Sequence, residues 1–221
     1  MRLILARHGN TFDPGAKVVW VGNGEDLPLV QGGVAQALAL GESLKKVGFK
    51  MERLFCSQLK RTREYARLLV KQMGVSKEPE VRTDLNEIDY GNWGGLSTEE
   101  IIAKEPRAKE ALEKWEKESA WPEISPWTPG PEAMSAQVAR LAGELVAKGV
   151  GDGILVSSNG VLRYFLKLVP GEWERRVCVR DFKMKTGHSG VLEYAQGQWK
   201  ILGWNLSPTD LEGVLGVGIR S

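Results

Sequence analysis

Residues Met1–Asn10 read MRLILARHGN, an apolar run that changes abruptly into polar residues. The apolar part, Leu3–Ala6, has the length and the bounds of a short buried strand. Open α/β sheets bind their ligands beyond the carboxyl ends of the strands, which is where Arg7 and His8 would lie. Arginine offers a planar set of donors to a phosphate group, and Gly9 lets backbone N–H groups approach it closely. These residues leave two interpretations open, a phosphate site or a polar turn after an edge strand.

The composition is that of an ordinary globular protein, with 221 residues of which 42% are hydrophobic and 26% are charged. We expect a single domain over residues 1–221. The net charge of +2 gives no reason to expect nucleic-acid binding, whereas a small phosphorylated molecule needs only a local basic cluster. Nothing in the sequence indicates an oligomeric state.

Cysteine and histidine are scarce, which limits the metal and disulfide chemistry of the chain. Cys56 and Cys178 form neither a disulfide framework nor a metal-binding pattern, and two histidines are too few for a histidine-rich metal site. No carboxylate cluster suggests a metal cage, so we expect no metal and no cofactor. With no signal-peptide pattern and no apolar run near the roughly 20 residues of a membrane span, the sequence predicts a cytoplasmic protein without a membrane partner.

Predicted strands alternate with predicted helices, which indicates an α/β sheet with helices on both faces. Besides Leu3–Ala6, we expect strands at Arg53–Cys56, Val81–Leu85 and Gly153–Ser158, and a hairpin of Val191–Tyr194 with Trp199–Trp204. Helices are predicted near residues 32–47 and 59–73, from residue 97, and near residues 106–117, 131–148 and 160–168. Residues 12–29 are predicted to form either a lid or an ordinary surface loop, 119–131 to be irregular, and 205–221 to include a loose C-terminal tail.

The predicted helix that begins near Leu59 carries three basic residues, Lys60, Arg61 and Arg63, in its first turn. Helix dipoles favour acidic residues there, so this arrangement is locally unfavourable. A bound anion would offset the repulsion, and a solvated basic turn is the alternative.

Several segments, in order between residues 3 and 163, resemble the motifs of the histidine phosphatase superfamily, whose fold is phosphoglycerate mutase-like. The resemblance lies in Leu5–Thr11, Asp26–Ala37, Ser57–Thr62, Leu85–Glu87 and Tyr90–Gly95. It implies a three-layer α/β/α sandwich around a mixed, mainly parallel sheet.

The same resemblance implies a role for each matching residue. His8 would be the nucleophile that becomes phosphohistidine, Arg7 and Arg61 would clamp the phosphoryl oxygens, and Glu87 would act as general acid and then as general base. Asn10, Thr11 and Gly160 would lie at the phosphate, and a phosphate or sulfate ion would be expected to bind there. For Glu87, the alternative is a capping or ion-pair carboxylate.

The chain departs from the family at its second histidine. Where Ser/Thr-His-Gly is expected after the last predicted central strand, this sequence has Ser158-Asn159-Gly160. Asn159 donates a hydrogen bond but carries no positive charge, so the resemblance implies a weaker clamp on the transition state. Three interpretations remain: natural variation with reduced activity, a degenerate phosphate-binding protein, or an engineered substitution.

Candidates for the rim of the site are Trp20, Lys60 and His188. His188 would either replace the missing histidine or be a solvated loop residue. Trp20 and three further tryptophans, Trp93, Trp121 and Trp127, fall in loops expected around the site. They would either stack on a planar or apolar part of the substrate or pack in the core.

The resemblance favours a metal-independent phosphomonoesterase of the histidine acid phosphatase type, acting on a small phosphorylated metabolite. The loop Gly91–Gly95 and the segment after His8 resemble phosphatases more than mutases. The alternatives are a phosphoglycerate mutase and a catalytically degenerate phosphate-binding or interaction protein. The sequence does not identify the substrate.

Overall fold

A six-stranded sheet, in the order β3–β2–β4–β1–β5–β6, forms the centre of the computed structural model, which describes residues 1–216. The pairings β3–β2, β2–β4 and β4–β1 are parallel, whereas β1–β5 and β5–β6 are antiparallel. This confirms the mixed, mainly parallel sheet. The strands are β1 (Arg2–Arg7), β2 (Arg53–Cys56), β3 (Glu80–Val81), β4 (Gly153–Ser157), β5 (Ser189–Ala195) and β6 (Gln198–Leu206).

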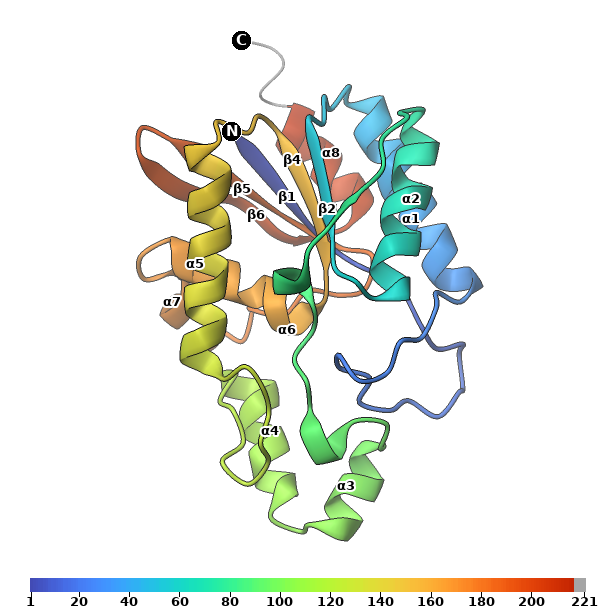
Figure 1. Cartoon of the computed structure of the whole chain (residues 1–221), viewed down its shortest axis with the longest axis vertical. Helices are drawn as coiled ribbons and strands as arrows, with labels where there is room; N and C mark the ends of the chain where they lie inside the picture. The colour runs from blue at the N-terminus through green and yellow to red at the C-terminus, as the bar shows by residue number, and fades with distance from the viewer. Residues whose placement is uncertain (217–221) are drawn as a thin grey trace.

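Helices cover both faces of the sheet, because side chains alternate across its strands. Along β1, Ile4 and Ala6 are buried in one apolar cluster, and Leu3 and Leu5 in another on the opposite face. The first cluster includes α1 (Gln31–Lys46), α2 (Lys60–Met73) and α8 (Pro208–Gly216), and the second includes α5 (Pro131–Ala147). These layers confirm the α/β/α sandwich (Figure 1).

The remaining helices lie towards the carboxyl ends of the parallel strands. In Figure 1, α3 and α4 project away from the sheet at the bottom of the view, while α6 and α7 lie just below it. Their bounds are α3 (Thr98–Lys104), α4 (Ala108–Glu118), α6 (Asn159–Leu162) and α7 (Glu172–Cys178), with 3-10 turns at Thr83–Leu85, Gly91–Trp93 and Arg163–Leu168. None of the helices in residues 1–216 has the length and apolar character needed to span a membrane.

The predicted loose C-terminal tail is wrong for most of its length. β6 continues to Leu206, and α8 follows with Leu211 and Leu215 fully buried against the cluster that includes α1. The Glu212 carboxylate of α8 accepts a hydrogen bond from Ser43 Oγ of α1 at 2.9 Å. Two buried leucines one helical turn apart decide this docking. The rest of the predicted tail, residues 217–221, lies outside the described residues.

A strand predicted at Val81–Leu85 is also wrong, since β3 ends at Val81 and a 3-10 turn follows. Arg82 donates to both carboxylate oxygens of Asp84, at 2.9 and 2.7 Å, which bends the chain. Leu85 is then fully buried, and the next residues enter the site. Helix α7 was not predicted from the sequence.

Candidate active site

The candidate site lies where β1 and β4 end side by side. Arg7 pairs with Ser157 in the parallel register, and the His8 N–H donates to the Ser157 carbonyl at 3.0 Å. The chain therefore leaves both strands at the same edge of the sheet, and His8 comes next to the start of α6 at Asn159. A cleft of about 870 Å³ opens there, lined by Arg7, His8, Asn10, Thr11, Trp20, Arg61, Glu87 and Asn159 among others.

Local hydrogen bonds and burial keep the His8 imidazole neutral and oriented. Nδ1 lies 2.7 Å from the Gly9 carbonyl, so Nδ1 carries the proton, and Nε2 accepts a 3.2 Å hydrogen bond from Arg61 Nε. Burial, followed by the charges of Arg61 and Arg7, lowers the pKa of His8 well below its ordinary value. The result is an Nε2 lone pair directed towards the arginine side of the cleft.

Close backbone contact fixes the turn that carries His8. A Cβ atom on Gly9 would lie 2.5 Å from the Gly33 carbonyl oxygen, and one on Gly33 would lie 2.3 Å from the Asn10 carbonyl oxygen. Only glycine at both positions lets the turn after β1 pass so near the start of α1.

Arg61 joins His8 to the loop that covers it. Its Nη1 and Nη2 groups donate to the Glu25 and Gly22 carbonyls at 2.9 and 2.6 Å. Burial lowers the pKa of Arg61, and the carbonyls hold the guanidinium without neutralising it. Residues 10–22 line the cleft almost continuously, as the lid interpretation expected.

The basic first turn of α2 is relieved partly by a side chain of the protein itself. Asp26 accepts from the Lys60 backbone N–H at 2.6 Å, and its carboxylate lies 4.0 Å from Lys60 Nζ. Lys60 is exposed and does not line the cleft, so the structure does not bring it to the rim.

Arg7 and Asn159 are both tied to the backbone of Met184. Arg7 Nη1 donates to the Met184 carbonyl at 2.5 Å, and the Met184 N–H donates to Asn159 Oδ1 at 2.9 Å. Asn159 Oδ1 is therefore occupied, which leaves the amide Nδ2 as the group available to a ligand. Arg7 Nε is buried and has no hydrogen-bond partner within residues 1–216.

Glu87 lies at the start of α6, opposite the arginines. Its carboxylate accepts from the Ile88 N–H at 2.9 Å and from the Gly160 N–H at 3.2 Å. A Cβ atom on residue 160 would lie 2.2 Å from Glu87 Oε1, so a larger residue there would displace the carboxylate. The Gly160 N–H thus contacts the carboxylate, whereas the sequence predicted that Gly160 would lie at the phosphate.

The remaining predicted site residues divide between the cleft and its surroundings. Asn10 and Thr11 line the cleft, and Asn10 Oδ1 accepts from Thr186 Oγ1 at 2.5 Å. Trp20 lines it too, with its indole N–H on Thr98 Oγ1 at 3.1 Å. His188 lies outside the lining, with Nδ1 2.8 Å from the Asn205 carbonyl, so it does not take the place of a second histidine here.

Most of the tryptophans expected at the mouth pack in the core instead. Trp93 and Trp127 are buried, and neither they nor Trp121 line the cleft. Trp127 packs against five other aromatic rings: Trp20, Tyr90, Trp93, Trp115 and Trp121.

Sequence reasoning missed two cleft residues of consequence, Arg163 and Trp115. Arg163 interrupts the apolar run Val161–Leu166 and follows Asn159 by one helical turn. A single charge inside an apolar segment was the available signal.

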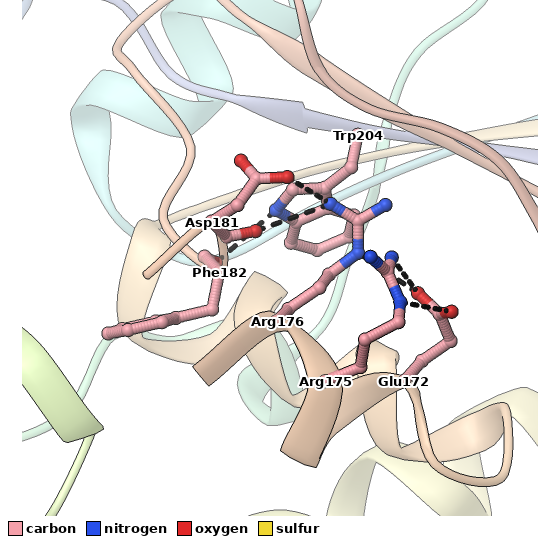
Figure 2. A network of polar contacts seen from close by, with 6 residues as sticks. All are labelled: Glu172, Arg175, Arg176, Asp181, Phe182 and Trp204. Carbon is pink, nitrogen blue, oxygen red and sulfur yellow. Dashed lines mark hydrogen bonds and ion pairs between the residues drawn. The ribbon is translucent and has the colours of Figure 1, made fainter. Parts of the chain in front are cut away.

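A partly exposed ion-pair network holds the segment that precedes Met184. Figure 2 shows Arg176 of α7 beside Glu172 and Asp181, with ion-pair distances of 3.1 and 2.6 Å. The Trp204 indole N–H donates to the Phe182 carbonyl at 3.3 Å. We call Asp181–Met184 the strap, because these contacts hold it against α7 and β6.

Replacing Arg176 with Met is expected to lower the free energy of unfolding by about 1–3 kcal/mol, because it leaves partly buried carboxylates without their partner. Urea denaturation measures the change. Arg175→Met is the matched control, since Arg175 binds the same Glu172 but its side chain is 54% exposed. The Arg175→Met substitution should lower the free energy of unfolding by under about 1 kcal/mol. Equal costs for the two variants would contradict a structural role for the strap.

The depressed pKa of His8 predicts a specific pH dependence of stability. The unfolded chain takes up a proton at His8 below about pH 6.5, whereas the folded protein does so only at lower pH. The free energy of unfolding should therefore fall on acidification from pH 7.5 to 5.5, by at most about 1.4 kcal/mol per pH unit. Urea denaturation in phosphate-free buffer tests this.

His8→Gln should remove this decline, and His188→Gln should keep it. A wild-type protein and a His8→Gln variant with parallel pH profiles would rule out a neutral, buried His8.

The comparisons with known proteins agree with this geometry. The model of the histidine phosphatase superfamily (branch 1) matches residues 3–207. A 2,3-bisphosphoglycerate-dependent phosphoglycerate mutase of Methylobacterium radiotolerans is 31% identical over 192 residues, 84% of this chain and 85% of the relative. Among solved structures, a mycobacterial glucosyl-3-phosphoglycerate phosphatase superposes with a TM-score of 0.71 at 27% identity, covering 93% of this chain and 99% of its own.

A putative alpha-ribazole-5'-P phosphatase from Escherichia coli shares the fold with a TM-score of 0.74 at 23% identity, over 94% of this chain and 98% of its own. The sequence match, the order of the strands and the pairing of His8 with an arginine at the strand ends agree with one another. The chain belongs to the histidine phosphatase superfamily.

Proposed function

We propose that this protein is a metal-independent phosphomonoesterase that acts on a small phosphorylated metabolite through a phosphohistidine on His8. Family membership supports phosphoryl-transfer chemistry. The geometry of His8 is the observation that carries the proposal. Its Nδ1–H group donates to the Gly9 carbonyl and its Nε2 atom faces Arg61. The ring is therefore neutral, and its Nε2 lone pair has a fixed direction.

In the first step, the Nε2 lone pair attacks phosphorus and the bond from phosphorus to the ester oxygen breaks. Arg61 Nε then turns its N–H from Nε2 to a phosphoryl oxygen, and Arg7 stabilises the developing charge from the β1 side. The Gly9 carbonyl accepts a hydrogen bond from the Nδ1–H group of the phosphorylated ring. This hydrogen bond favours the positive charge of the ring.

Glu87 carries the protons in both steps. It donates one to the departing alkoxide, and it then removes one from the water that attacks the phosphohistidine. The products are the alcohol, inorganic phosphate and neutral His8. The Ile88 and Gly160 N–H groups fix the carboxylate for this role.

Asn159 supplies a neutral donor from the start of α6. Because Met184 N–H occupies its Oδ1, its Nδ2 is free to bind a phosphoryl oxygen. A neutral hydrogen bond is about half as strong as a charge-assisted one, so we propose that the clamp is weakened.

A phosphoglycerate mutase is the second candidate, favoured by the 31% identity to a relative with that name. A phosphate-binding protein without turnover is the third, favoured by the neutral Asn159. One set of assays separates them: aryl phosphate hydrolysis, interconversion of 2- and 3-phosphoglycerate with added 2,3-bisphosphoglycerate, and calorimetric binding of inorganic phosphate.

The wild-type protein should hydrolyse p-nitrophenyl phosphate between pH 5 and 8 with EDTA present. His8→Ala should reduce kcat by about a thousandfold or more, because the nucleophile is lost. Rapid quenching should trap an acid-labile phosphoenzyme in wild type only. His188→Ala is the control and should retain activity, since this ring lies outside the cleft.

Phosphate binding without hydrolysis would indicate the binding protein, and isomerisation that is faster than hydrolysis would indicate the mutase. Hydrolysis that survives His8→Ala would contradict the proposed nucleophile.

Asn159→His should raise kcat by about tenfold, which corresponds to roughly 1.4 kcal/mol of added transition-state stabilisation. A protonated imidazole there could donate a charge-assisted hydrogen bond to a phosphoryl oxygen. Ser158→His is the matched variant, because Ser158 continues the register beside His8, is 1% exposed and does not line the cleft. A gain in Ser158→His alone would show that the charge is missing at position 158 and not at 159.

A further inference from the structure

Arg163, which neither the sequence motifs nor the proposed mechanism uses, is a buried cation in the wall of the same cleft. It is 2% exposed and lies one turn after Asn159, where α6 passes into the 3-10 turn. Two hydrogen bonds fix it: Nε donates to the Asn159 carbonyl at 3.2 Å, and Nη1 donates to Ser119 Oγ at 3.0 Å.

Two aromatic rings hold the guanidinium plane in place. Its carbon lies 4.2 Å from the centre of the Trp115 ring and 5.1 Å from that of Phe182. Phe182 belongs to the strap, and Figure 2 shows it beside Trp204 and Asp181. The guanidinium is therefore preorganised from α6, from α4 with the segment after it, and from the strap.

Within residues 1–216 the charge of Arg163 has no acidic partner, unlike the charges of Arg82 and Arg176. Arg82 pairs with Asp84 and Arg176 with Asp181, at 2.7 and 2.6 Å. No carboxylate of residues 1–216 is paired with Arg163, and its Nη2 group has no hydrogen-bond partner among them.

Burial accordingly lowers the pKa of Arg163, and Glu87 and Glu116 favour its charge only from a distance. A buried cation of this kind is stabilised when an anion enters beside it.

Two other arginines are placed to bind the reacting phosphoryl group. Arg61 contacts the nucleophile directly, and Arg7 flanks it from β1. Arg163 stands on another wall, with Trp115, and the cleft of about 870 Å³ has room for more than a phosphate.

We propose that Arg163 binds a second anionic group of the substrate, a carboxylate or a further phosphate, and thereby selects phosphate esters that carry two acidic groups. A planar guanidinium with a free Nη2 suits either group. This inference rests on the proposed function, because it assigns the reacting phosphate to the His8 pocket.

Binding of non-hydrolysable ligands tests the inference without requiring turnover. Three ligands share one chain length: 3-phosphonopropionate, propane-1,3-bisphosphonate and propylphosphonate, which lacks a second acidic group. Calorimetry should show that wild type binds at least one of the first two about 10- to 100-fold more tightly than propylphosphonate. The tighter of the two identifies the second group as carboxylate or phosphate.

Arg163→Gln should remove this preference and leave propylphosphonate binding within about twofold, and Arg163→Lys should keep part of it. Arg82→Gln is the matched control, since it removes a partly buried arginine outside the cleft lining, and it should preserve the preference.

Wild type with no preference, or an Arg163→Gln variant that weakens all three ligands equally, would overturn the inference. Failure of the proposed function is a separate result, because it would appear as absent hydrolysis of every phosphate ester while these binding ratios are still measured.

Discussion

The parallel pairing of β1 with β4 is the constraint on which the rest of the site depends. Its register places Arg7 beside Ser157. His8 and Asn159, which are far apart in the sequence, therefore both follow the carboxyl ends of neighbouring strands. Backbone hydrogen bonds and fully buried side chains on both faces fix this register, since a slip by one residue would turn every apolar side chain to the wrong face. Close packing of Gly9 against Gly33 then determines how the nucleophile leaves the strand.

The site is held together by hydrogen bonds that leave its positive charges intact. Backbone carbonyls accept the side-chain N–H groups of Arg7, Arg61 and Arg163, whereas Arg82 and Arg176, away from the cleft, bind carboxylates. A carbonyl orients a guanidinium without cancelling its charge, so the cleft keeps its attraction for anions. This arrangement costs stability, because buried cations are poorly solvated, and the same arrangement keeps His8 neutral.

Chemistry and selectivity come from different parts of the fold. In the proposed function, the phosphoryl pocket lies at the ends of β1 and β4, which the sheet holds in place. The other walls come from the loop after β1, from the start of α3 and from α4; α3 and α4 project from the sheet in Figure 1. Relatives of one family that are named as mutases and as phosphatases are compatible with this division, because loops vary more readily than the sheet that positions them.

The sequence by itself determined the alternation of strands and helices, the polar end of the first strand at His8, and the family. These features depend on local patterns of apolar residues, glycines and capping residues, such as Ser97 with Glu100 in their capping box. Only the tertiary structure decided that α8 docks on α1, that Trp127 is core and that His188 and Lys60 lie outside the cleft. It also decided that Arg163 lines the cleft without a carboxylate partner in the described part of the chain, residues 1–216. Each of these depends on which distant side chains a residue meets, and local periodicity carries no information about such contacts.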